Sequence, residues 1–174
     1  EAIDYEQLNK EDKINYRIFK FQIEDFIAGI EFEDYLMPLN AEGGFYTNLG
    51  ASAKRLRFTS VSNYETYLKR LEAIPHYLAA YTNLMRLGIE KGITQPKVIV
   101  KNYKALIATY LKQETFYEPL TKLEQLDIQQ EEKQRYQKAV KKVVNETVLP
   151  AYQVFDAFME KEYLPAAKTA IGAI

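Results

Sequence analysis

The stretch SNYETYLKRLEAIPHYLAAYTNLMRLGIEKG, residues 62–92, predicts a long helix with a bend in its middle. Its apolar residues recur at spacings of three and four, which places them along one face of a helix. These residues are Tyr67, Leu68, Leu71, Ile74, Leu78, Tyr81, Leu84 and Met85. Pro75 interrupts the helix, because a proline removes one hydrogen bond and clashes with the carbonyl four residues before it. We therefore expect a kink near Leu71.

The two ends of this helix carry their own signals. Ser62 and Glu65 have the S-x-x-E spacing, in which the hydroxyl and the carboxylate reciprocally cap free amides of the first turn. Gly88 or Gly92 is the expected end, since glycine readily takes the left-handed conformation that stops a helix. The helix should begin at Ser62 and end at one of these glycines.

Residues 9–30 predict a helix that is apolar on more than one side. One stripe, at spacings of three and four, consists of Tyr16, Phe19, Ile23, Phe26 and Ile30. A second group, Ile14, Ile18 and Phe21, falls largely off that stripe. Helices that are apolar all round are usually buried between neighbours. We therefore expect this helix to lie centrally in the fold.

Three more segments complete the helical pattern, over residues 94–111, 118–125 and 127–164. The last of them is interrupted at Pro150, which predicts a second bend. No segment alternates apolar and polar residues as a half-buried strand would. The sequence therefore predicts an all-α bundle of four to five helices, two of them kinked by proline.

Composition limits the classes of protein to which the chain can belong. Its 174 residues suffice for one helical domain, residues 1–174, that buries roughly two thirds of its unfolded surface. Lys and Arg total 23 against 24 Asp and Glu, so the net charge of −1 argues against a nucleic-acid partner. The absence of cysteine excludes disulfides and thiolate zinc sites. No apolar run approaches the ~20 residues of a transmembrane segment.

Glycine and proline predict a long irregular loop over residues 34–60, which includes EGGFYTNLG at 42–50. Connections of this length in compact domains are usually functional or disordered, and the many apolar residues here indicate a loop that is packed down. The bundle should thus be interrupted once, by this glycine-rich and aromatic loop.

Four residues of that loop are our candidates for a substrate cleft: Gly43, Gly44, Phe45 and Tyr46. Adjacent glycines allow another backbone or a ligand to approach closely, and the two aromatic rings could then form a cleft wall. The alternative is a tight turn whose aromatic residues anchor the loop onto the bundle. The sequence leaves both interpretations open.

No residue is assigned a catalytic or metal-binding role. His76 is the only histidine, and a metal site or a base would need partners that the sequence does not identify. The chain lacks H-E-x-x-H, the P-loop and the G-x-S-x-G pattern of serine hydrolases. We expect His76 to serve packing or to lie on the surface, and we expect no cofactor in this chain.

Three segments, taken in order, carry a resemblance to a known family. They are FKFQIEDFIAGIEFEDYLMPLNAEGGFYTNL (19–49), YLKRLEAIPHYLAAYTNLMRLGIEKGITQP (67–96) and VLPAYQVFDAFMEKEYLPAA (148–167). They resemble the N-terminal part of the bacterial domain-of-unknown-function family 885, DUF885, which is similar to gluzincin-type zinc metallopeptidases. The similarity covers roughly residues 15–170.

This resemblance implies a longer parent protein. Members of the family are several times longer, and their H-E-x-x-H helix and further carboxylate ligand lie in the C-terminal part. It therefore implies zinc and peptidase activity for the full-length parent, a C-terminal domain of the same polypeptide as partner, and possible peptide substrates. Tyr46 stands where we expect many relatives to have a histidine. Lipoprotein leaders among relatives imply a cell-envelope location, without excluding the cytoplasm.

Two hypotheses about function follow. In the first, the chain is a non-catalytic N-terminal helical fragment of such a peptidase-like protein, and it forms a wall of the substrate cleft. In the second, it is an autonomous helical binding or scaffold module without an enzymatic parent. A fragment should expose an apolar patch where the absent domain docks, whereas an autonomous module should have a mostly polar surface.

Overall fold

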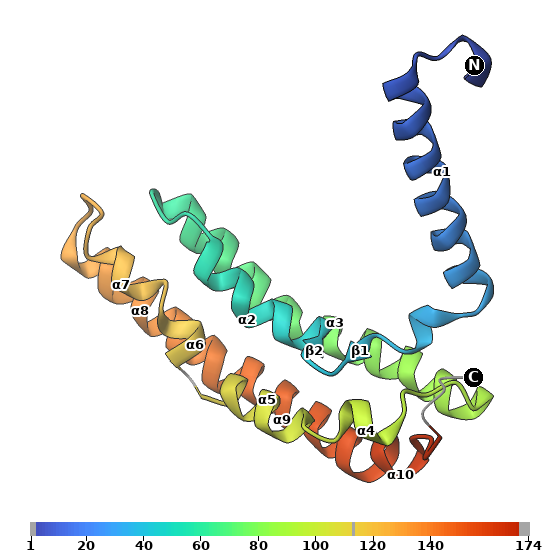
Figure 1. The fold of residues 1–174 in the computed structure, drawn as a ribbon. Helices are drawn as coiled ribbons and strands as arrows, with labels where there is room; N and C mark the ends of the chain where they lie inside the picture. Colours follow the sequence, from blue (N-terminus) through green and yellow to red (C-terminus); the bar gives the residue numbers. More distant parts are fainter. Residues whose placement is uncertain (1–2, 113, 171–174) are drawn as a thin grey trace. The chain divides into compact units, whose positions relative to one another are not determined.

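A computed structural model describes residues 3–112 and 114–170, except for the side chains of residues 51–54 (Figure 1). The all-α prediction is confirmed, because 75% of the structure is helical and the strands of the described residues form one small two-stranded sheet. Contacts divide the chain into two compact units, residues 1–35 (unit 1) and 36–174 (unit 2). Each unit is described by itself, and the single domain over 1–174 stays a prediction.

Unit 1 consists mainly of the helix α1 (Lys10–Glu31), preceded by the short 3-10 helix η1 (Tyr5–Gln7). The side chain of Asn9 caps α1 by accepting the backbone N–H of Asp12 at 2.9 Å. These bounds confirm the predicted helix, but none of its residues is buried. Nothing in the described part of unit 1 covers the apolar sides of α1, and its central position in the fold stays a prediction.

Unit 2 contains the remaining elements, joined to unit 1 through the 3-10 helix η2 (Asp34–Leu36). In chain order they are β1 (Leu39–Asn40), β2 (Gly43–Gly44), α2 (Phe45–Arg55), α3 (Val61–Lys91), α4 (Lys97–Val100), α5 (Tyr103–Tyr110), α6 (Glu114–Tyr117), α7 (Leu120–Leu123), α8 (Gln130–Val143), the π-helical turn η3 (Val144–Val148), α9 (Leu149–Phe158), the π-helical turn η4 (Met159–Tyr163) and α10 (Leu164–Ala166). α3 packs along α8, η3 and α9, and α2 packs against α3, α5 and α6 (Figure 1).

α3 forms the centre of the core of unit 2. One face of it is buried at helical spacing, through Tyr64, Tyr67, Leu71, Ile74, Leu78, Thr82, Met85 and Gly88. The bounds confirm the predicted helix, and the predicted end at Gly92 is confirmed by its left-handed backbone, with φ of +70°. Pro75 lies inside the helix, as predicted.

The predicted N-terminal cap of α3 is wrong by two residues. The helix begins after Ser60, and Asn63 Oδ1 accepts the backbone N–H groups of Thr59 and Ser60, both at 3.0 Å. Glu65 instead accepts a hydrogen bond from the Tyr136 hydroxyl at 3.2 Å. Asn63 thus accepts the backbone amides at the start of the helix, the role that the S-x-x-E spacing predicted for Glu65.

The last long helical segment, from α8 to α10, passes its prolines through two π-helical turns. The π turn η3 comes just before Pro150, and η4 comes just before Pro165. In each turn a backbone N–H reaches the carbonyl five residues back, from Leu149 to Val144 and from Leu164 to Met159. A π turn relieves the clash that proline would make with the carbonyl four residues before it. The predicted interruption at Pro150 is therefore a change of helix type.

The predicted loop over residues 34–60 is shorter than expected. The helix α2 occupies 45–55, and η2, β1 and β2 also lie within the range. Phe45 and Leu49 stand one helical turn apart and both pack on the core of unit 2, so tertiary contacts stabilise a helix that the glycines concealed. The predicted helix over 94–111 is likewise divided, into α4 and α5.

Candidate functional site

The two glycines of the candidate site form a tight antiparallel ladder between β1 and β2. Leu39 pairs with Gly44, and Asn40 pairs with Gly43. Gly43 and Gly44 have φ of +136° and +149°, values that residues with a side chain rarely adopt. A Cβ on Gly44 would lie 2.5 Å from the backbone oxygen of Pro38. Both glycines are therefore required by the backbone itself.

The same glycines start the helix α2. The Thr47 hydroxyl accepts the backbone N–H of Gly44 at 3.3 Å and donates to the Gly44 carbonyl at 2.8 Å. A Cβ on Gly43 would collide with the Thr47 side chain. The second glycine is the N-cap of α2, and Thr47 holds the turn in place.

Phe45 and Tyr46 point into the core of unit 2, with exposed fractions of 5% and 2%. The ring of Phe45 stacks on Tyr81, with centroids 4.3 Å apart, and meets Phe155 edge-on at 5.2 Å. Tyr152 donates its hydroxyl to the Tyr46 carbonyl at 2.7 Å. Burial raises the pKa of Tyr46 to about 12. The burial of both rings fits the anchoring interpretation, and their role as a cleft wall stays a prediction.

A segment that the sequence analysis did not single out fixes the hairpin in place. Gln95 donates its side-chain amide to the Leu39 carbonyl at 2.8 Å, and its backbone N–H donates to the Tyr163 hydroxyl at 3.0 Å. Thr94 accepts the backbone N–H of Lys168 at 3.3 Å. One short segment thus connects the hairpin with η4 and the chain beyond it. The sequence indicated only that Thr94 begins the predicted helix over 94–111, and the contacts of Gln95 do not follow from that pattern.

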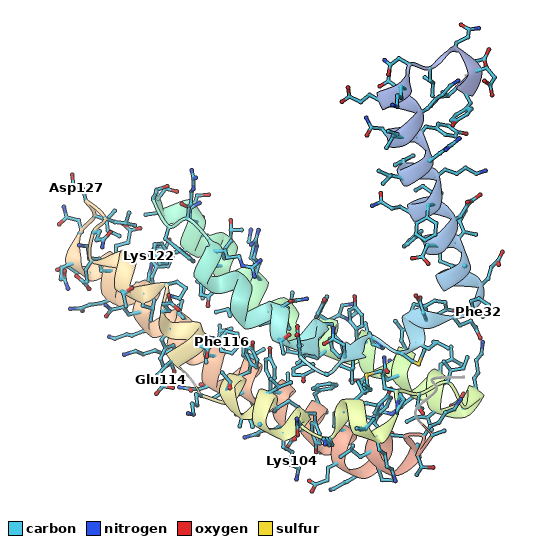
Figure 2. All side chains as sticks on the ribbon, viewed as in Figure 1. Phe32, Lys104, Glu114, Phe116, Lys122 and Asp127 are labelled. Carbon is cyan, nitrogen blue, oxygen red and sulfur yellow. The ribbon has the colours of Figure 1, made fainter. Side chains whose placement is uncertain are left out.

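An apolar hollow of about 190 Å³ lies between α2, α3 and α6. Its lining includes Leu49, Leu56, Leu71, Ile74 and Phe116. Phe116, labelled in Figure 2, is fully buried, and its carbonyl accepts the Tyr67 hydroxyl at 2.9 Å. Arg70 and Tyr77 also line the hollow. A space of this size and polarity accommodates a small apolar group.

The titratable side chains of the described residues form no metal site. They contain no group of three or more His, Cys, Asp or Glu side chains that could hold a metal ion. His76 is exposed on α3, which agrees with the surface role expected for it.

The chain matches the family described as "Bacterial protein of unknown function (DUF885)" over residues 1–173. It belongs to this family. No curated protein and no solved structure gave a match. The DUF885 match confirms the predicted family. Within the described part of the chain, no helix is both long and apolar enough to cross a membrane.

Proposed function

We propose that this DUF885 chain is a supporting helical part of a zinc-metallopeptidase-like protein, without a catalytic residue of its own. In this proposal it packs against a C-terminal domain of the same polypeptide, which holds the zinc ion and acts on peptides. The family match supports the parentage only at the level of DUF885. The peptidase and zinc parts rest on the resemblance of the family to gluzincins.

The observation that carries the proposal is the exposed apolar surface of unit 1. Its exposed large apolar residues between 14 and 35 are Ile14, Ile18, Phe19, Phe21, Ile23, Phe26, Ile27, Ile30, Phe32 and Tyr35. Eight of them lie on α1, and Phe32 and Tyr35 follow it. Contiguous apolar patches on soluble proteins mark interaction sites once they exceed a few hundred Å². Such a surface fits a part that docks on another domain better than an autonomous module.

The second apolar group of α1, Ile14, Ile18 and Phe21, is our docking surface for that domain. Its exposed fractions are 51%, 54% and 70%. Covering a side chain of this size contributes about 1.5 to 3 kcal/mol. Three such residues, one turn apart along the helix, suffice to position a domain. The hairpin and the buried rings of Phe45 and Tyr46 then act as internal bracing, with no contact to substrate.

The test begins with the full open reading frame, in which a downstream H-E-x-x-H is expected. That longer polypeptide should bind zinc and hydrolyse peptides, and the 174-residue chain should do neither. The double substitution Ile18→Ser with Phe21→Ser should detach the C-terminal domain, which limited proteolysis would detect. Val98→Ser, at a 53% exposed position of unit 2, is the matched control. Peptide hydrolysis by the 174 residues alone would overturn the proposal.

A second candidate function is that of a binding module, and the hollow beside Arg70 favours it. A small carboxylate with an apolar body would place its tail against Leu49 and Ile74 and its charge near the guanidinium. Calorimetric titration of the chain with octanoate and with octanol tests the binding module against the supporting role proposed above. Binding of octanoate alone, lost in Arg70→Gln, would favour the module.

A further inference from the structure

The five residues of the first apolar stripe of α1, which we name the α1 seam, have the spacing of a coiled-coil core. They are Tyr16, Phe19, Ile23, Phe26 and Ile30, at successive spacings of three, four, three and four. This is the alternation of a and d positions in a heptad. The last four are between 43% and 67% exposed, and Tyr16 meets the ring of Tyr5 at 5.2 Å.

The α1 seam is separate from the docking surface proposed above. Ile14 and Ile23 are nine residues apart, which is two and a half turns at 3.6 residues per turn, so they lie on opposite sides of the helix. A single flat partner would cover only one of the two sides. The α1 seam therefore calls for an occupant of its own.

The charges along α1 indicate what that occupant is. Within α1, residues 10–20 contain four basic and two acidic residues, whereas residues 21–31 contain three acidic residues and no basic one. A second α1 running in the opposite direction sets the basic half of each copy beside the acidic half of the other. A parallel pair would set like charges together, which is unfavourable.

The helix dipole favours the same direction. Glu24, Asp25 and Glu31 lie in the C-terminal half of α1, toward the end whose partial negative charge disfavours acidic side chains. In an antiparallel pair, the positive N-terminal end of the partner helix lies beside them. Both the side-chain charges and the backbone dipoles thus select one arrangement.

We propose that the α1 seam pairs with the α1 seam of a second copy of this chain, as an antiparallel two-helix contact. Phe19, Ile23 and Phe26 form its centre, and Lys20, which flanks the seam, lies beside the acidic half of the other copy. Since the seam spans only about two heptads, the dimer is reversible, with a dissociation constant in the micromolar range.

The first test is sedimentation equilibrium of the 174-residue chain from nanomolar to high micromolar concentration. A monomer–dimer equilibrium is expected, and Ile23→Asp should raise the dissociation constant about 100-fold by placing a charge in the apolar contact. Val154→Asp is the matched control, since Val154 is an exposed apolar residue of unit 2 and should leave the constant unchanged. A chain that stays monomeric, or that grows into larger aggregates, would overturn the proposal.

A charge exchange tests the identity of the partner. The variant Lys13→Glu with Arg17→Glu and Lys20→Glu makes both halves of α1 acidic, and Glu24→Lys with Asp25→Lys and Glu31→Lys makes both halves basic. Each variant alone should be monomeric, and an equimolar mixture should dimerise. Three substitutions on other surfaces, Lys101→Glu, Lys138→Glu and Lys141→Glu, should have no effect. Failure of the mixture to dimerise would contradict a contact between two α1 helices.

Orientation is measured with spin labels, which the absence of cysteine makes simple. A label on Glu11→Cys should lie about 35 Å from its counterpart in an antiparallel pair centred on Ile23, at a rise of about 1.5 Å per residue. In a parallel pair the separation would be only about 10 Å, the distance between packed helices. The short distance would overturn the proposed arrangement. None of these measurements depends on zinc, on peptide hydrolysis or on a C-terminal domain, so this inference and the proposed function fail separately.

Discussion

The helices α1 and α3 have the same kind of sequence pattern and opposite surroundings. In both, apolar residues recur at spacings of three and four, and both form where that pattern predicts them. α3 buries eight residues in the core of unit 2, whereas α1 buries none. Periodicity therefore predicts where a helix forms, and it leaves open what covers the apolar face. If burial decides stability, substitutions on α3 should change the free energy of unfolding more than matching substitutions on α1.

The largest expected effect is alkaline unfolding of unit 2, in which α3 is the central helix. Burial raises the pKa of Tyr46, Tyr64 and Tyr103 from 10.0 to about 12. Between pH 10 and pH 12 these tyrosine hydroxyls are ionised in the unfolded chain and still protonated in the folded chain. The free energy of unfolding therefore falls as pH rises. The stabilisation is fully present below pH 10 and is lost toward pH 12.

Near-ultraviolet circular dichroism and tyrosinate absorbance should therefore change together, in one cooperative step, during an alkaline titration. The named tyrosines all lie in unit 2, so the step reports on the surroundings of α3. Gradual ionisation with an unchanged near-ultraviolet spectrum would mean that these hydroxyls are already open to solvent.

Next in size is a pair of truncations, one on each helix. Met85→Ala on α3 removes a fully buried side chain and should cost about 2 to 5 kcal/mol in the free energy of unfolding. Phe26→Ala on α1 removes a side chain that is 67% exposed and should change it by less than about 0.5 kcal/mol in the monomeric chain. Urea denaturation below the dimerisation range measures both. Equal costs would show that α1 is covered after all.

Much of the helical framework was predictable from local pattern. The bounds of α1, the stop of α3 at Gly92 and the all-α class follow from spacing and glycine chemistry, which are properties of neighbouring residues. The start of α3 was misplaced because Asn63 and Glu65 both offer side-chain acceptors near the first turn, and only the fold shows which one is used. The choice between two neighbouring acceptors cannot be predicted from the spacing of apolar residues.

The candidate site was less predictable, for a physical reason. The helix α2 follows two glycines, so the sequence indicated a loop, and the packing of Phe45 against Tyr81 that stabilises the helix is a contact across 36 positions of the chain. Gln95 likewise acts through Leu39 and Tyr163, both distant in sequence. Contacts between residues so far apart in sequence form only in the complete fold, and the local sequence pattern does not predict them.

A smaller effect is expected for one glycine on each helix. Gly88→Ala on α3 would place a Cβ 2.6 Å from the backbone oxygen of Ile93 and should cost about 1 to 3 kcal/mol by overpacking. Gly29→Ala on α1 would meet only the side chain of Asp34, which can rotate away. It should stabilise α1 by up to about 1 kcal/mol through helix propensity. Hydrogen exchange resolves the two helices, and slower exchange in α3 of Gly88→Ala would contradict the packing described.

The smallest effect concerns one ion pair on each helix. Arg86 of α3 binds both carboxylate oxygens of Glu162 in η4, at 2.7 and 2.8 Å, whereas Lys20 of α1 reaches Glu24 on its own helix at 3.5 Å. Arg86→Gln should cost less than about 1 kcal/mol, because both partners are 44% exposed. Lys20→Gln should cost only a few tenths of a kcal/mol in the monomer.

Acid titration separates this ion pair from simple packing by the Arg86 side chain. The hydrogen bond from Arg86 holds the pKa of Glu162 below its usual 4.5, so the pair contributes stability above that pH. As pH falls through the lowered pKa, the carboxylate is protonated and the contribution disappears. The difference in unfolding free energy between the parent chain and Arg86→Gln should therefore shrink in acid and also in high salt. A difference that persists under both conditions would assign it to the apolar stem of Arg86, which lies against the ring of Phe158 with its guanidinium carbon 5.0 Å from the centroid.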